Sequence, residues 1–407
     1  MATRRINVSS GRALEAQAHY SRALRIGDTV FQAGTTSMGR DGAVRGAGDA
    51  AKQVDAILAV AEWAMGKAGG SLDDVVRNRM YVTDIGVADA VARAFAKRLK
   101  NARPTSTLVQ VAGLMRPEML VEAELEAVDG AGKTAQRVGS GRKIEEEYAY
   151  CRALRVGDRV YLSGTTSLQP SGVVEGTGDM YRQTRVVLDT IFAALAEAGG
   201  TPADIVYTKS WFTDTSKTAD YTRAWLEAFG DVRPTSTTLG CPALLHPDML
   251  IEIEAEAIIG AAKTRRDGYT RKEREKPRGY ARTVTVGDRI YMSGCTDLDD
   301  AGQPQAPNDW AAQYDNALAT VRWSLEQAGS SLDDVVRRQT FTVQRAEVNR
   351  AFGAGPAYFA TSRPASMGCR IAGLARSELL VEVEVFAVKG AGQGIEAVGP
   401  DAVDPLG

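Results

Sequence analysis

"RPTST" at residues 103–107 leads into the Glu-rich run "LVEAELEAV", and the same turn returns at 233–237 and, as "RPASM", at 363–367. Each copy lies 130 residues after the one before, and a similar run follows it, "LIEIEAEAI" in the second and "LVEVEVFAV" in the third. A fixed internal period is the sequence signature of a tandem repeat. We therefore predict that the 407-residue chain consists of three copies of one structural unit.

The period holds over much more than the turn. "HYSRALRIGDTVFQAGTTS" (19–37) aligns without a gap with "AYCRALRVGDRVYLSGTTS" (149–167) and "GYARTVTVGDRIYMSGCTD" (279–297). A later block, "AGGSLDDVV", returns as "AGGTPADIV" and "AGSSLDDVV" at the same interval. Triplication of one gene segment explains this agreement far better than chance does.

The segments between the matching blocks are predicted to be connectors. The expected division is three repeats at 1–130, 145–260 and 275–390, linkers at 131–144 and 261–274, and a C-terminal tail at 391–407. The linkers are rich in Gly, Lys and Arg, as connecting segments often are. The basic run at 265–278 is interpreted as a solvated linker, with contact to RNA as the alternative.

One linker contains "GAGKT" at 130–134, which resembles part of a phosphate-binding loop. That loop requires a glycine six residues before its lysine, and this chain has Ala127 there. The corresponding stretches of the other repeats, "GAAKT" and "GAGQG", also lack the full motif. No nucleotide site is therefore predicted here.

The apolar pattern of the first repeat predicts five strands and two helices. From Asp49 to Lys67 apolar residues recur at helical spacing, and Gly69 and Gly70 supply the stop. The expected strands are 21–27, 28–34, 75–83, 106–114 and 119–128, and the expected helices are 49–67 and 87–100. The order is ββαβαββ, which predicts an α+β unit with two helices packed on one side of the sheet.

Composition limits the classes of function that are open. With 44% apolar and 25% charged residues the chain is typical of a soluble globular protein. Its net charge of −2 implies no general attraction to nucleic acid or to an anionic membrane. The apolar runs are too short to span a bilayer, and the N-terminus lacks the apolar core of a secretory signal.

Cysteine and histidine are too few and too scattered for most metal sites. The four cysteines have no CxxC spacing, which favours reduced thiols in a cytoplasmic protein. The two histidines, His19 and His246, have no ligand-spaced companion, so neither a zinc site nor a Ser-His-Asp triad is expected. No cofactor motif is present, and no cofactor is predicted.

Each repeat resembles the Rid (YjgF, reactive intermediate deaminase) family. The resemblance rests on a Tyr before the first strand, "SG" at the end of the second strand, the Pro turn after the second helix, and the final "IEIEA" of the second repeat. It implies a chorismate-mutase-like fold in which single units form homotrimers with clefts at their interfaces. Three units in one chain then imply an intramolecular pseudo-trimer.

The same resemblance implies the class of reaction and the residues that carry it. Members of the family hydrolyse reactive imines or enamines and release ammonia, so the expected partner is a small-molecule substrate. The tyrosine of the cleft corresponds to Tyr20, Tyr150 and Tyr280. The serine of "SG" corresponds to Ser163 and Ser293, with Ala33 in the first repeat. The glutamate that positions water or a proton corresponds to Glu122, Glu252 and Glu382.

One family feature is missing from all three repeats. The arginine that grips the substrate carboxylate corresponds to Ser106, Ser236 and Ser366. A serine cannot supply the charged, two-pronged contact that arginine makes with a carboxylate. The resemblance therefore implies altered specificity. Arg370 lies four residues after Ser366, on the same face of a strand, and could replace the anion contact in the third repeat.

Other interpretations of these residues remain open. The tyrosines are also explained as aromatic residues at the start of a strand, and the glutamates as members of structural ion pairs, because a buried unpaired carboxylate is costly. Three functions are compatible with the sequence. They are a Rid-type hydrolase or tautomerase of altered specificity, a chorismatase-like enzyme that acts on an enol ether, and a non-catalytic binder of small molecules. The clefts around the second and third repeats retain Tyr, Ser and Glu together and are the expected active sites.

Overall fold

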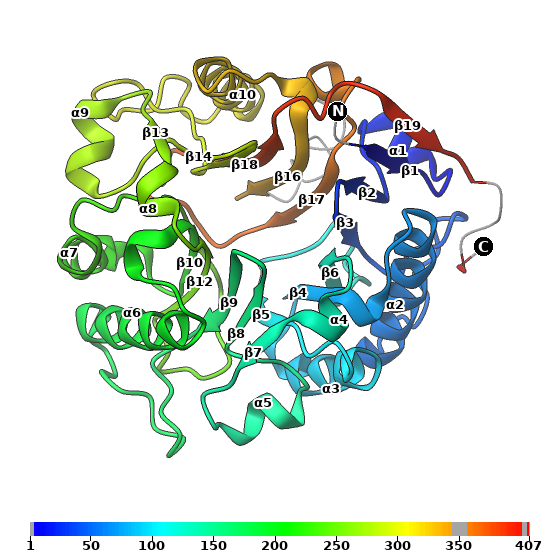
Figure 1. Cartoon of the computed structure of the whole chain (residues 1–407), viewed down its shortest axis with the longest axis horizontal. Coiled ribbons are helices and arrows are strands. Elements are labelled where there is room, and N and C mark those ends of the chain that lie inside the picture. The colour runs from blue at the N-terminus through cyan, green and yellow to red at the C-terminus, as the bar shows by residue number, and fades with distance from the viewer. Residues whose placement is uncertain (1–3, 344–355, 401–404, 407) are drawn as a thin grey trace.

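The structure is a computed structural model that describes residues 4–343, 356–400, 405 and 406. Three sheets of seven, six and six strands surround a common centre. Figure 1 shows the strands gathered toward the middle and the long helices on the outside. This is the arrangement expected of three α+β units that form a pseudo-trimer.

The first unit and its neighbours in the sheet follow the predicted order. The first sheet has the strand order β19-β1-β2-β3-β6-β4-β5, in which β4 and β5 run parallel. Its elements are β1 (Arg5–Val8), α1 (Ala13–Gln17), β2 (Ala23–Ile26), β3 (Thr29–Thr35), α2 (Ala50–Lys67), β4 (Val75–Val82), α3 (Ala88–Leu99), β5 (Thr105–Gln110) and β6 (Val121–Val128).

The second unit repeats this plan in the order β11-β10-β12-β9-β8-β7. Its elements are α4 (Ala131–Thr134), β7 (Gln136–Val138), α5 (Lys143–Glu147), β8 (Ala153–Val156), β9 (Arg159–Thr165), α6 (Met180–Glu197), β10 (Ile205–Phe212), α7 (Thr218–Phe229), β11 (Thr235–Gly240) and β12 (Ile251–Ile258).

The third unit has the order β13-β14-β15-β18-β16-β17. Most of its second predicted helix lies outside the described residues. Its elements are α8 (Ala261–Thr264), β13 (Arg266–Gly268), α9 (Lys272–Glu275), the 3-10 helix η5 (Lys276–Arg278), β14 (Thr283–Val286), β15 (Arg289–Met292), α10 (Trp310–Gln327), β16 (Val335–Thr342), the 3-10 helix η7 (Pro356–Phe359), β17 (Ala365–Arg370), β18 (Val381–Val388) and β19 (Ile395–Val398).

Local sequence explains why α2 begins and ends where it does. The Asp49 side chain accepts a hydrogen bond from the Lys52 backbone N–H at 3.1 Å, which caps the first turn. Gly69 has φ +78, a left-handed conformation that favours glycine and stops the helix. The predicted apolar stripe is buried against the sheet, as shown by Val54, Ile57, Leu58, Ala61 and Met65.

The predicted linkers and tail contain ordered strands. β7 and β13 lie within 131–144 and 261–274, and each pairs antiparallel with the first hairpin strand of the following unit. On the first unit that position is held by β1. β19, within the tail, pairs parallel with β1 and so ties the end of the chain to its beginning (Figure 1).

The Arg-Pro turn joins one repeat to the next. The Pro104 carbonyl accepts a hydrogen bond from the Cys151 N–H at 3.1 Å. The matching bonds are Ala281 N–H to Pro234 O at 3.3 Å and Ser21 N–H to Pro364 O at 3.2 Å. The turn is therefore a contact between repeats, and its threefold recurrence follows from the three seams of the ring.

Buried charges close the ring at its centre. Arg79 Nε donates to Glu254 Oε1 at 2.7 Å, and Lys209 Nζ lies 3.3 Å from Glu384 Oε1. Gln339 of the third repeat donates to Glu124 of the first. Each contact runs from one repeat to the next, so each of these three buried side chains has a hydrogen-bond or ion-pair partner in a neighbouring repeat.

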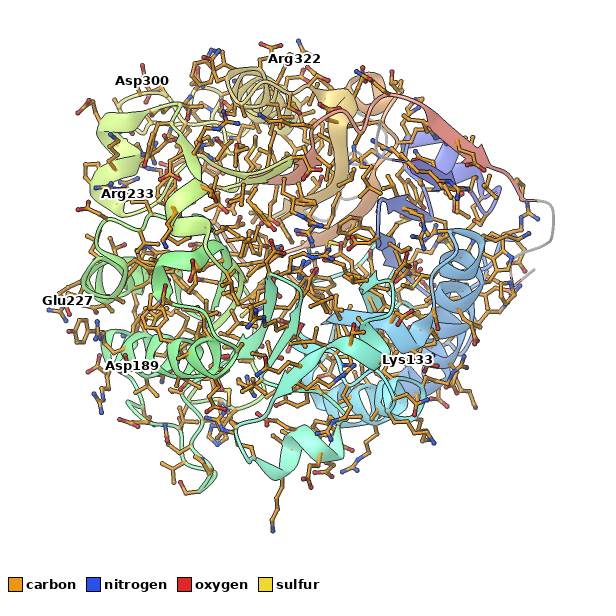
Figure 2. All side chains as sticks on the ribbon, viewed as in Figure 1. Lys133, Asp189, Glu227, Arg233, Asp300 and Arg322 are labelled. Atoms are coloured by element: carbon orange, nitrogen blue, oxygen red, sulfur yellow. The ribbon has the colours of Figure 1, made fainter. Side chains whose placement is uncertain are left out.

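Apolar side chains complete the centre and polar side chains cover the outside. Three equivalent aromatic residues, Tyr81, Trp211 and Phe341, meet with ring centroids 6.1 and 5.8 Å apart. Asp189 and Arg322 point outward from the surrounding helices (Figure 2). Within the described residues, no helix is both long and apolar enough to cross a membrane.

The Arg79–Glu254 pair provides a test of how far the repeats depend on one another. Burial raises the pKa of the Glu254 carboxyl, but Arg79 outweighs burial and holds that pKa at about 2. Glu254→Gln leaves the Arg79 charge buried without its counter-ion, so we expect urea unfolding to show a loss of about 3–5 kcal/mol. The exposed pair Arg93–Asp89 supplies the control, because Arg93→Ala should cost below about 1 kcal/mol. Equal losses in the two variants would contradict this role of Arg79–Glu254.

Candidate functional site

Three cavities lie at the seams between repeats, and each takes residues from both sides. We call them the 1–2 cleft, the 2–3 cleft and the 3–1 cleft, after the repeats that they separate. The 2–3 cleft has a volume of about 770 Å³, the 1–2 cleft about 390 Å³ and the 3–1 cleft about 30 Å³. Each is lined by a predicted Tyr, Ser and Glu, namely Tyr280, Ser236 and Glu382, Tyr150, Ser106 and Glu252, and Tyr20, Ser366 and Glu122.

The two larger clefts are those that the sequence favoured. In the smallest cleft three methionines, Met38, Met115 and Met119, line the wall beside Tyr20. Methionine fills irregular gaps readily, and only about 30 Å³ is left. The 1–2 and 2–3 clefts are therefore the candidate ligand sites.

An arginine holds the hydroxyl of the cleft tyrosine, and a glutamate holds that arginine in turn. Neither residue was predicted from the sequence. Arg152 donates to the Tyr150 hydroxyl at 3.0 Å, to the Gly164 carbonyl at 2.8 Å and to Glu145 at 3.1 Å. The other repeats have the same set, Arg22 with Glu15 and Arg282 with Glu275. The signal was present in the sequence as Tyr-x-Arg with a Glu five residues before the Tyr, three times in register.

The predicted glutamates are buried and hold their protons unusually tightly. The pKa of Glu122, Glu252 and Glu382 is raised to about 8, mainly by burial and also by the negative charge of the next glutamate along each strand. Arg22, Arg152 and Arg282 oppose this rise. A carboxyl with a pKa near the working pH is able both to donate and to accept a proton.

The glycine of "SG" makes room for this carboxyl. A side chain at Gly164 would overlap Glu252 Oε1, and the same holds for Gly294 and Glu382. Because glycine has no side chain, the glutamate carboxyl is able to pack directly against the backbone at this position.

Ser163 and Ser293 lie behind the cleft wall and not in it, contrary to expectation. Ser163 Oγ accepts from the Ser106 N–H at 2.9 Å and donates to the Cys151 carbonyl at 2.6 Å. Ser293 does the same for Ser236, at 2.8 Å. Successive side chains of a strand point to opposite faces, and the next residue, Gly164, is the one that lines the cleft. These serines position the Arg-Pro turn.

Arg370 also lies elsewhere than expected. Its Nε donates to the Ala112 carbonyl at 2.9 Å, and its backbone pairs with Gly113. None of the three clefts is lined by Arg370. The side chain joins the third repeat to the first, so it is not the anion contact that its strand position suggested.

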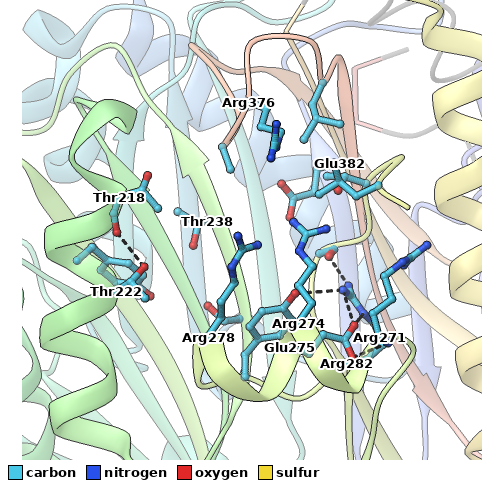
Figure 3. Close-up of a pocket in the computed structure, with 18 of the residues that line it drawn as sticks. Thr218, Thr222, Thr238, Arg271, Arg274, Glu275, Arg278, Arg282, Arg376 and Glu382 are labelled. Carbon is cyan, nitrogen blue, oxygen red and sulfur yellow. Dashed lines mark hydrogen bonds and ion pairs between the residues drawn. The ribbon is translucent and has the colours of Figure 1, made fainter. Parts of the chain in front are cut away.

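Arginines from another part of the chain line the 2–3 cleft. Arg274 and Arg278 come from α9 and η5, and Arg376 comes from the loop before β18. Figure 3 shows all three around Glu382. The interpretation of 265–278 as a solvated linker is therefore wrong for Arg274, which is half-buried, whereas Arg278 is exposed and also lines the cleft. Glu275 turns this segment inward, because its buried carboxylate is bound to Arg282.

These guanidinium groups are not neutralised. Within the described part of the chain, no carboxylate forms an ion pair with Arg274, Arg278 or Arg376, whereas Arg271 beside them pairs with Asp300. Burial lowers the pKa of Arg274, and the charge of Arg278 adds to that effect. Uncompensated positive charge in a partly buried cleft favours an anionic ligand.

No cluster of three or more His, Cys, Asp or Glu side chains that could hold a metal ion occurs in the described ranges.

Comparison with known proteins gives one consistent result. The family model described as endoribonuclease L-PSP matches residues 10–129, 141–259 and 272–389. An uncharacterized protein of Streptomyces coelicolor is 33% identical over 129 residues, which are 32% of this chain and 96% of that protein. A solved member of the YjgF/YER057c/UK114 family from Mycobacterium tuberculosis is 37% identical, with 31% of this chain and 100% of that chain covered and a TM-score of 0.28.

The similarity to one solved chorismatase extends over more than a single repeat. A chorismatase covers 78% of this chain and 93% of that chain, with 14% identity and a TM-score of 0.52. At this identity the similarity shows the fold alone.

The raised pKa of Glu382 predicts a pH dependence of stability. Because its folded pKa of about 8 lies above the ordinary 4.5, the folded state binds more protons than the unfolded state between these values. Glu382 therefore lowers the free energy of unfolding as pH rises from 5 to 8, by up to about 1.4 kcal/mol for each pH unit. Glu382→Gln should make the decline measured by urea unfolding less steep by up to that amount. The exposed Glu326→Gln is the control, and identical slopes for both variants would contradict the burial of Glu382 as an acid.

Proposed function

The chain belongs to the YjgF/Rid family, whose model matches it once in each repeat, and from this premise we propose that the 2–3 cleft is the active site of a hydrolase for anionic imines or enamines. The type of reaction comes from the family resemblance. The preference for an anion comes from the residues of this cleft. The proposal rests on one observation. A buried acid, Glu382, shares one cavity with Arg274, Arg278 and Arg376, none of which forms an ion pair with a described carboxylate.

The arginines supply what the Arg-Pro turn lacks. Ser236 stands where the family holds the substrate carboxylate, and it lines the same cavity as Arg278. A guanidinium binds a carboxylate through charged, paired hydrogen bonds, whichever segment it comes from. The altered specificity that the missing arginine implies is therefore, for this cleft, a preference for a substrate with one or two carboxylates held by arginines of another segment.

Glu382 acts first as an acid and then as a base. Its carboxyl gives a proton to the β-carbon of an enamine, which becomes an iminium ion. The resulting carboxylate takes a proton from water as the water oxygen bonds to the iminium carbon. Collapse of the carbinolamine breaks the C–N bond and releases ammonia and a ketone, with Glu382 protonated as at the start. A pKa near the working pH suits both steps.

Tyr280 and the hydroxyls of the wall orient the substrate. Arg282 donates to the Tyr280 hydroxyl at 3.5 Å, so that hydroxyl is free to give its own proton to a substrate nitrogen or oxygen. Thr218, Thr222 and Thr238 line the opposite side of the cavity. Such convergent polar groups fix the orientation of a ligand.

A second candidate is hydrolysis of an enol ether that carries two carboxylates. The specific observation that favours it is the number of cleft arginines without an ion-pair partner among the described residues, since three guanidinium groups are enough for two carboxylates. Protonation of the vinyl carbon by Glu382, addition of water and loss of the alcohol would give a keto acid. This chemistry yields no ammonia, and so the product distinguishes it from the first candidate.

Ammonia release tests the proposed reaction. Imines generated in situ from aspartate and glutamate should be hydrolysed much faster than in buffer. Glu382→Gln should lower kcat by about 10²–10⁴-fold, as loss of a general acid–base does. Arg278→Tyr and Arg274→Ile, which install the residues of the second repeat, should each raise KM by about tenfold or more through loss of a charged hydrogen bond.

The matched control is Arg223→Ala, which removes an exposed positive charge near the cleft without altering its lining. It should leave kcat and KM unchanged. If no imine in the panel is consumed, the hydrolase proposal fails. Pyruvate release from an enolpyruvyl ether would then support the second candidate, and stable binding without turnover would support a binder.

A further inference from the structure

The 1–2 cleft differs from the 2–3 cleft at the positions that carry its charge. Ile144 and Tyr148 stand where the next repeat has Arg274 and Arg278. His246 takes the place of Arg376. None of the three guanidinium groups that make the 2–3 cleft cationic has a counterpart here.

The wall of the 1–2 cleft is apolar as well. Leu108 replaces Thr238, and Ala88 and Ala92 replace Thr218 and Thr222. The apolar side chains that line it include Met80, Ile85, Phe95, Leu99, Leu108, Ile144, Leu168 and Met249. A cavity of about 390 Å³ with such walls and few polar groups falls within the range of small-ligand sites, toward its lower end.

Two polar atoms of side chains that line this cleft, Glu252 Oε2 and Asn78 Oδ1, lack a hydrogen-bond partner. Glu252 is 4% exposed, and its Oε2 has no hydrogen-bond partner in the structure. Burial of an unsatisfied carboxyl oxygen is costly, and such groups are usually satisfied in native proteins. A hydrogen-bond donor on a ligand would remove that cost. Burial also raises the pKa of Glu252 to about 8, which a neighbouring cation would reverse.

The remaining charged groups around the cleft do not favour a carboxylate. Arg152 is engaged by Tyr150, Glu145 and the Gly164 carbonyl. Asp89, at the wall, is bound to Arg93 and accepts from the Tyr148 hydroxyl at 2.8 Å. The acidic groups Glu252 and Asp89 thus face the cavity, and Arg152 is not among its lining residues.

We propose that the 1–2 cleft is a separate binding site for a small apolar molecule with a cationic nitrogen and no carboxylate, such as an aryl-alkyl amine or its iminium ion. The nitrogen donates to Glu252. The hydrocarbon part packs against Phe95, Leu99 and Ile144. One chain would thus hold two clefts of opposite charge preference. The proposal concerns binding and does not rest on catalysis in the 2–3 cleft.

Isothermal titration calorimetry with 2-phenylethylammonium on the full chain tests this site. We expect one amine bound per chain, and 3-phenylpropionate should not displace it. Glu252→Gln removes the charge that holds the nitrogen, and Ile144→Arg places a guanidinium where the third repeat has Arg274. Each variant should weaken amine binding by tenfold or more. Ile144 is only half-buried, so the arginine has a route to solvent.

The control is Val173→Arg, which adds the same charge at a side chain that is 63% exposed and outside the cleft. It should bind the amine as the wild type does, and the urea midpoint of every variant is compared to verify folding. Any of three results would overturn the proposal. They are no amine binding up to millimolar concentration, an unchanged affinity for the amine in both cleft variants, and displacement of the amine by 3-phenylpropionate. Ammonia release in the 2–3 cleft is measured separately, so either proposal can fail alone.

Discussion

Arg79, Lys209 and Gln339 occupy the same position in the three repeats, and each reaches a buried glutamate of the next repeat around the ring. A charge buried at the centre is tolerated only with such a partner. No repeat supplies this partner for itself at these positions. The closed ring of three is therefore a condition for burying these groups, and the clefts exist because the ring has seams.

Each seam places a turn of one repeat against the Tyr and Glu of the next. The Pro carbonyl accepts from the backbone just after the tyrosine, so residues 106, 236 and 366 are fixed at the mouth of a cleft that belongs to two repeats. In a homotrimer of identical chains the three seams would be alike. Fusion into one chain removes that restriction. The 2–3 cleft has become cationic, the 1–2 cleft apolar and the 3–1 cleft nearly filled.

Much of the fold follows from local sequence, because helical and strand periodicity are visible within a single repeat. Asp49 and Gly69 mark the ends of α2, and the 130-residue period gives the number of units. The cleft arginines were missed because Arg274 and Arg278 stand in a basic run whose local pattern resembles a solvated connector. The buried contact between Glu275 and Arg282 turns that run inward, and its signal, a Glu seven residues before an Arg in all three repeats, was not used. Ser163 and Arg370 were misplaced for a related reason, since strand alternation gives a face but not the element that covers it.

A crystal structure with 2-oxoglutarate tests the central claim most directly, because this keto dicarboxylate is the product of hydrolysing the imine of glutamate. The structure predicts one molecule in the 2–3 cleft, with its carboxylates on Arg274, Arg278 or Arg376 and its carbonyl carbon facing Glu382. A molecule bound in the 1–2 cleft, or a 2–3 cleft that stays empty at saturating concentration, would contradict the assignment of this seam as the anionic active site.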